Sequence, residues 1–67
     1  MAVARVTEIS STSPKSFDDA IALGIARATK TLRNVKSACV KEQRVEIVDN
    51  RVTEYQVNLL VTFVLDD

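Results

Sequence analysis

The sequence predicts an α+β fold of the order β-α-β-β, in which a three-stranded antiparallel sheet partly wraps around one helix. Three observations predict it: three segments have strand-like composition, one segment between the first two has apolar residues at helical spacing, and an Asp-Asn pair joins the last two strands. At 67 residues the chain is long enough for one small domain, which we place over residues 1–67.

The first predicted strand covers Ala2 to Ile9, where β-branched residues are frequent and neither face is uniformly apolar. The segment Ser10 to Pro14 contains four hydroxyl residues and the only proline, and is therefore expected to end this strand.

A helix is expected to follow, with Ser16 as its N-cap and Asp18 and Asp19 in its first turn. Its end is expected near Arg33-Asn34. Cations late in the helix offset the negative end of its dipole. The apolar stripe of this helix comprises Phe17, Ile21, Gly24/Ile25, Ala28 and Leu32.

The third segment, Val35 to Val48, has strand composition but an apolar phase that changes along its length, which predicts a bulge or a bend. Asp49-Asn50 is a favourable hairpin turn. The last strand, Arg51 to Leu65, alternates clearly. Its predicted core face comprises Tyr55, Val57, Leu59, Val61, Phe63 and Leu65, and its other face comprises Gln56, Asn58, Leu60, Thr62 and Val64.

This second face is half apolar, which favours burial against another copy of the chain. A chain of this size buries only about 60% of the surface that its unfolded form exposes, so it usually depends on disulfides, a metal or association. Cys39 is the only cysteine and there is no histidine, which leaves association with identical chains.

Composition also limits the function classes. The net charge is zero, which argues against nucleic acid as a partner, and no apolar segment is long enough to span a membrane. We expect a cytoplasmic protein whose Cys39 stays a reduced thiol. Without histidine, and with Gly24 as the only glycine, the chain lacks the usual catalytic and phosphate-binding motifs, so we do not expect an enzyme.

One polar residue, Gln56, lies in the middle of the last strand on the face assigned to subunit contact. A buried amide needs hydrogen-bond partners. Gln56 could find them in another subunit, or it could bind the edge of a planar heterocycle.

The order of these motifs resembles the dodecin family of small flavin-binding proteins. The resemblance covers nearly the whole chain. It rests on Thr12-Ser13-Pro14, Ser16-Phe17-Asp18-Asp19-Ala20, Ala26-Arg27-Ala28, Thr31-Leu32-Arg33-Asn34-Val35 and Glu54-Tyr55-Gln56-Val57.

This resemblance implies a hollow homododecamer that stores or sequesters a flavin, riboflavin or FMN, without turnover. In flavin-binding members, tryptophans from two subunits stack on a pair of flavin rings, and a glutamine binds the ring edge. By position the glutamine is Gln56 and the tryptophan is replaced by Ser37, next to Ala38; Arg44 is a weaker candidate for ligand contact.

Because the chain contains no tryptophan, the resemblance leaves two functions open. One is flavin binding with lower affinity or a different stacking arrangement. The other is a shell without flavin that has a structural, calcium-binding or other small-ligand role. The residues do not indicate a metal site, since no acidic cluster has the density of a calcium loop.

Overall fold

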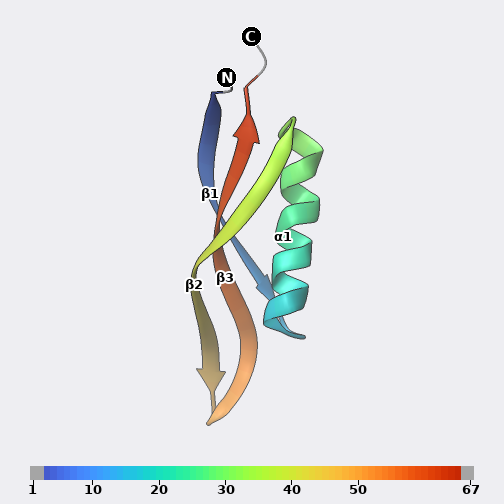
Figure 1. The fold of residues 1–67 in the computed structure, drawn as a ribbon. Helices are drawn as coiled ribbons and strands as arrows, with labels where there is room; N and C mark the ends of the chain where they lie inside the picture. The colour runs from blue at the N-terminus through green and yellow to red at the C-terminus, as the bar shows by residue number, and fades with distance from the viewer. Residues whose placement is uncertain (1–2, 66–67) are drawn as a thin grey trace.

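The structure, a computed structural model that describes residues 3–65, has the predicted β-α-β-β order (Figure 1). Its elements are β1 (Ala4–Ser13), α1 (Phe17–Thr31), β2 (Val35–Val48) and β3 (Arg51–Val64). The sheet is antiparallel with the order β1-β3-β2, so the last strand lies in the middle. Figure 1 shows α1 against one face of this sheet. Ala2, the predicted start of the first strand, lies outside the described residues.

β1 is longer than predicted, because it continues through the serine-rich segment to Ser13. The reason is that β3 offers partners along this whole length: Ser10 pairs with Asn58 and Ser13 with Tyr55. Ladder pairing with a long central strand outweighs the low strand propensity of serine. Ser13 is buried, and its hydroxyl donates a hydrogen bond to the Asp19 carboxylate at 2.5 Å. The predicted break is therefore shorter, and lies just before α1.

α1 begins as predicted, because the Ser16 hydroxyl accepts a hydrogen bond from the Asp19 backbone N–H at 3.0 Å. This bond satisfies one of the free N–H groups of the first turn. The helix ends at Thr31, two to three residues earlier than predicted. The Leu32 N–H donates to the Ala28 carbonyl at 2.9 Å, and Asn34 adopts a left-handed conformation that turns the chain into β2.

Replacing Ser16 with alanine is expected to lower the free energy of unfolding by about 1 kcal/mol, because the N-cap hydrogen bond is lost. Urea denaturation followed by circular dichroism, at one fixed protein concentration, measures this change. Ser16→Asp is the matched control: it keeps an acceptor at the cap and should lose little stability. An equal loss in both variants would contradict the capping role.

β2 is a bent strand, as the change of apolar phase predicted. Its pairing with β3 is irregular between Val35 and Ser37, between Val40 and Glu42, and between Glu46 and Ile47. Because of the second irregularity, residues before and after it that differ in phase lie on the same face of the sheet. The hairpin turn is also confirmed, since Asp49 and Asn50 form it with φ values of 52° and 63°.

The core lies between α1 and β3. Val57, Leu59 and Val61 are buried, which confirms the predicted core face, whereas Leu65 at its end is exposed. The helix contributes Ala20, Gly24 and Ala28, of which Ala20 was missing from the predicted stripe. The other predicted stripe positions are half-buried around them: Phe17, Ile21, Ile25 and Leu32.

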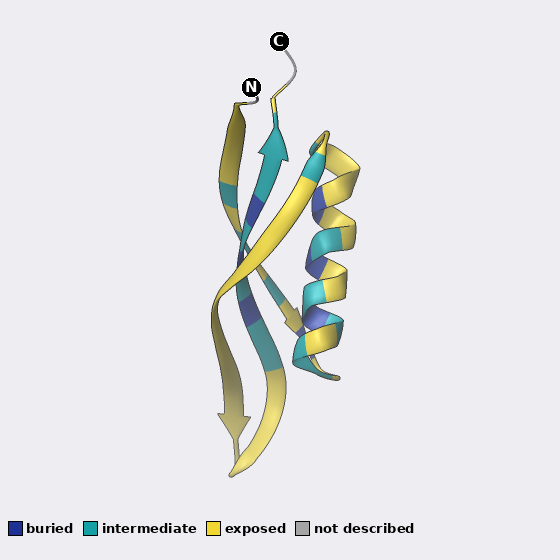
Figure 2. Ribbon diagram, viewed as in Figure 1, coloured by how far each residue is buried: buried dark blue, intermediate teal, exposed yellow. Residues whose placement is uncertain are grey.

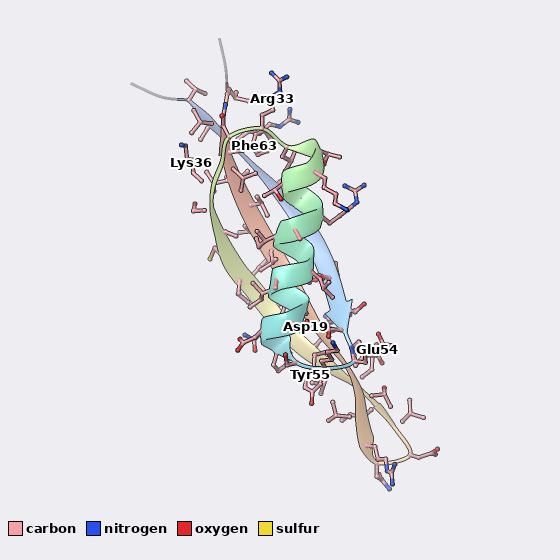
Figure 3. All side chains as sticks on the ribbon, turned by 90° about the vertical axis from the view of Figure 1, so that its right-hand side faces the viewer. Asp19, Arg33, Lys36, Glu54, Tyr55 and Phe63 are labelled. Atoms are coloured by element: carbon pink, nitrogen blue, oxygen red, sulfur yellow. The ribbon has the colours of Figure 1, made fainter. Side chains whose placement is uncertain are left out.

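Two close contacts bring the helix near the sheet. A Cβ atom at Gly24 would lie 3.1 Å from the Ser11 Cβ, so the absence of a side chain permits this approach. At the start of α1, the rings of Phe17 and Tyr55 meet edge to face, with their centres 5.1 Å apart. Figure 3 shows Asp19 and Tyr55 at this end of the helix and Phe63 at the other.

The far end of the β2–β3 hairpin extends beyond α1, and Figure 2 shows that it is exposed on both strands. The domain is accordingly elongated, with extents of 51 × 19 × 13 Å. Apolar side chains are exposed in this part of the hairpin: Val45, Ile47, Val48 and Val52.

Candidate functional site

The face of the sheet turned away from α1, here called the open face, is defined by the register. Cross-strand partners share a face and alternate residues along a strand face opposite ways. Since Val57, Leu59 and Val61 contact the helix side, the open face contains the alternate residues of β3 and their partners. Its members include Glu54, Gln56, Asn58, Leu60, Thr62 and Val64 of β3, Ala4, Val6, Glu8, Ser10 and Thr12 of β1, and Ser37, Cys39, Glu42, Arg44 and Glu46 of β2.

A continuous set of polar contacts crosses one half of the open face. The Gln56 Nε2 donates to the Ser10 Oγ at 3.0 Å and to the Asn58 Oδ1 at 3.4 Å. The Asn58 Nδ2 in turn donates to the Glu42 Oε1 at 2.6 Å, and the Arg44 guanidinium lies 3.5 Å from the same carboxylate oxygen. We call these five residues the polar chain. These contacts connect all three strands and fix the position of the Gln56 side chain.

The other half of the open face is less polar. Lys41 and Glu8 form an ion pair at 3.2 Å that joins the two outer strands, and Glu8 is opposite Leu60 on the central strand. Both side chains are about half exposed, so this pair contributes little to stability. The β3 residues in this half of the face are Leu60, Thr62 and Val64.

The predicted ligand residues are only partly brought together. Gln56 and Arg44 are direct partners in the β2–β3 register. Ser37 is on the same face but opposite Thr62, six residues from Gln56 along β3, which corresponds to about 20 Å at 3.4 Å per residue. Ala38 is opposite the buried Val61, on the side of the helix, and therefore does not belong to the open face.

Sequence reasoning missed three members of the polar chain. Asn58 could have been found, because it lies two residues from Gln56 on the same predicted face. Ser10 was assigned to the break after the first strand. Glu42 reaches this face only because of the bulge between Val40 and Glu42, whose position the apolar pattern does not fix.

Other features of the described residues do not add to the predicted ligand site. A groove of about 560 Å³ lies between β1 and α1, and none of the four predicted ligand residues lines it. Cys39, predicted as a packed side chain, is exposed on the open face. Within residues 3–65, no three potential metal-binding side chains gather at one place, and no helix has the length and apolar character to cross a membrane.

The fold and the open face together define a small binding domain with one helix-covered and one uncovered sheet face. The chain belongs to the dodecin family: the Dodecin family model matches residues 3–66. Dodecins are non-enzymatic binding proteins that are typically homo-oligomeric and often bind flavins.

Individual relatives agree with this assignment. The dodecin of Thermus thermophilus is 42% identical over 65 residues, which covers 97% of this chain and 94% of that protein. The structure of the dodecin from Streptomyces davaonensis is 41% identical and matches with a TM-score of 0.93, over 98% of this chain and 97% of that one.

A further solved structure, from Mycobacterium tuberculosis, is 30% identical with a TM-score of 0.83, over 96% of this chain and 91% of that one. It is described as a calcium-chelating calcium dodecin with a novel calcium-binding site.

Proposed function

We propose that the protein binds a flavin, riboflavin or FMN, within a homododecameric shell and thereby stores or sequesters it in the cytoplasm. The observation that carries the proposal is the position of Gln56 in a dodecin fold. Gln56 is half-buried on the open face, and Ser10 and Asn58 hold its side chain. A fixed amide of this kind can recognise the polar edge of a flavin ring at a small entropic cost.

The proposed site requires more than one copy of the chain. Ser37 and Gln56 are about 20 Å apart on one open face, which is wider than the three fused rings of a flavin. A ring that contacts both positions must therefore lie between two subunits. The exposed apolar side chains of the projecting hairpin also favour association, because such surfaces are usually buried by partners.

The chain has no tryptophan, so the flavin ring cannot stack on an indole as in flavin-binding members of the family. We therefore expect weaker binding than an indole-containing site would give. The test is a titration of riboflavin, followed by its fluorescence, on protein whose mass in solution has first been measured. A dodecamer that leaves riboflavin fluorescence unchanged at micromolar concentrations would reject flavin storage.

Replacing Gln56 with leucine is expected to weaken riboflavin binding by roughly tenfold, because a hydrogen bond to the ring edge is lost and the polar edge faces an apolar group. The same fluorescence titration measures the change. Gln43→Leu is the matched control: Gln43 is exposed on the neighbouring strand and is paired with Val57, on the other face. If both variants bind riboflavin as the unmodified protein does, Gln56 is not a ligand residue.

The second candidate function is calcium binding, which the Mycobacterium tuberculosis relative favours. Calcium prefers oxygen ligands. Calcium is titrated by calorimetry into a metal-free sample of the protein used for the riboflavin titration, and this measurement separates the two functions. Heat of calcium binding without any riboflavin response would favour the second candidate.

A further inference from the structure

The side chain of Gln56 has two unlike ends, and only one of them is already engaged. Its Nε2 donates to the Ser10 Oγ at 3.0 Å and to the Asn58 Oδ1 at 3.4 Å, which uses both N–H groups. Its Oε1 has no partner among residues 3–65. The carbonyl end, an acceptor, is therefore the end available to a ligand.

The polar chain explains why the amide points this way. An ionised carboxylate only accepts hydrogen bonds, so the contact at 2.6 Å between Glu42 and Asn58 requires Asn58 to present its NH₂ group to Glu42. The Arg44 guanidinium, which can only donate hydrogen bonds, lies 3.5 Å from the same carboxylate oxygen. With its NH₂ group directed to Glu42, Asn58 presents its Oδ1 to Gln56. Only the Nε2 of Gln56 can donate to that oxygen.

We infer that Glu42 is a positioning residue that fixes the direction of the Gln56 amide through Asn58, and that the open face thereby selects ligands with an N–H donor on their ring edge. The ligand part of this inference rests on the proposed flavin binding. The imide N–H of the isoalloxazine ring is such a donor. Ser10 does not decide the direction, since a hydroxyl both donates and accepts.

The direction of the amide is testable without any ligand. Neutron diffraction from crystals of the whole protein in D₂O distinguishes an ND₂ group from a carbonyl oxygen. In the unmodified protein we expect deuterium on the Gln56 atom that faces Asn58. In Glu42→Lys, a donor-only ammonium replaces the carboxylate, so Asn58 should turn its oxygen to Lys and its NH₂ group to Gln56. The Gln56 amide should then be reversed.

The consequence for ligands is tested with lumiflavin, which carries the imide N–H, and 3-methyllumiflavin, which lacks it. The unmodified protein should bind lumiflavin at least tenfold more tightly. The ratio of the two dissociation constants, 3-methyllumiflavin over lumiflavin, should fall to about one in Glu42→Lys. In Glu42→Ala it should lie between the values of the unmodified protein and of Glu42→Lys. If Glu42 had only a structural role, its replacement would weaken the binding of both ligands equally and leave the ratio unchanged.

Glu46→Lys is the matched control, because it makes the same change of charge on β2 outside the polar chain and should keep the ratio of the unmodified protein. An unchanged Gln56 amide in Glu42→Lys crystals, or an unchanged ratio in that variant, overturns the inference. If neither flavin binds the unmodified protein while the amide reverses in Glu42→Lys, the role of Glu42 is supported and flavin binding is rejected.

Discussion

Replacing Ser37 with tryptophan is expected to tighten riboflavin binding by about ten- to a hundredfold. Stacking on an aromatic face contributes about 0.5–1.5 kcal/mol beyond the apolar area buried, and 1.4 kcal/mol corresponds to a factor of ten. In a site shared by two subunits, each copy would add one indole face. Ser37 is exposed on the open face, so the larger side chain meets no buried neighbour within its own chain.

Ser37→Leu is the control for this substitution, since it adds apolar area without an aromatic face. Riboflavin titrations on both variants, at equal subunit concentration, separate stacking from simple burial. If the Ser37→Trp variant binds riboflavin no more tightly than the Ser37→Leu variant, the absence of an indole is not what limits the affinity. The site would then differ from that of the flavin-binding relatives in more than one residue.

The second large effect is expected in the core, where Leu59→Ala should lower the free energy of unfolding by about 2–5 kcal/mol. Leu59 is 1% exposed, and its side chain lies against the helix beside Gly24. In a chain of 67 residues the core is small, and a loss of this size is a large part of the total stability. Guanidinium denaturation at a fixed subunit concentration measures the change.

Leu23→Ala removes the same atoms from another leucine, but Leu23 lies on α1 and is 51% exposed. We expect this control to lose less than about 1 kcal/mol. A loss at Leu23 as large as that at Leu59 would show that the helix–sheet layer described here is not the main core.

Most of the fold could be predicted from local chemistry. Ser16 caps the helix because its hydroxyl is an acceptor at the right place, and Asp49-Asn50 turns the chain because both residues tolerate positive φ. The end of β1 could not be predicted in the same way. Its serines have low strand propensity, and only the length of the central strand, a tertiary property, makes them pair.

The candidate site was less accessible to sequence reasoning. Gln56 was found because it is an amide in the middle of the last strand, on the face assigned to subunit contact, and because the resemblance to dodecins places a ligand glutamine there. Its supporting residues depend on pairing between strands: Glu42 reaches Asn58 through a bulge, and Ala38 is placed on the helix side by the register. Alternation gives the face of a residue only relative to its own strand, so ligand positions on different strands cannot be aligned without the register.

The irregular pairing of β2 has a consequence for solubility. β2 is one border of the sheet, and a long regular border strand is a template for uncontrolled strand addition and fibrils. Its three register shifts interrupt the row of free backbone donors and acceptors, and Lys36 and Lys41 add charge along it. Growth by adding strands at this border is therefore disfavoured.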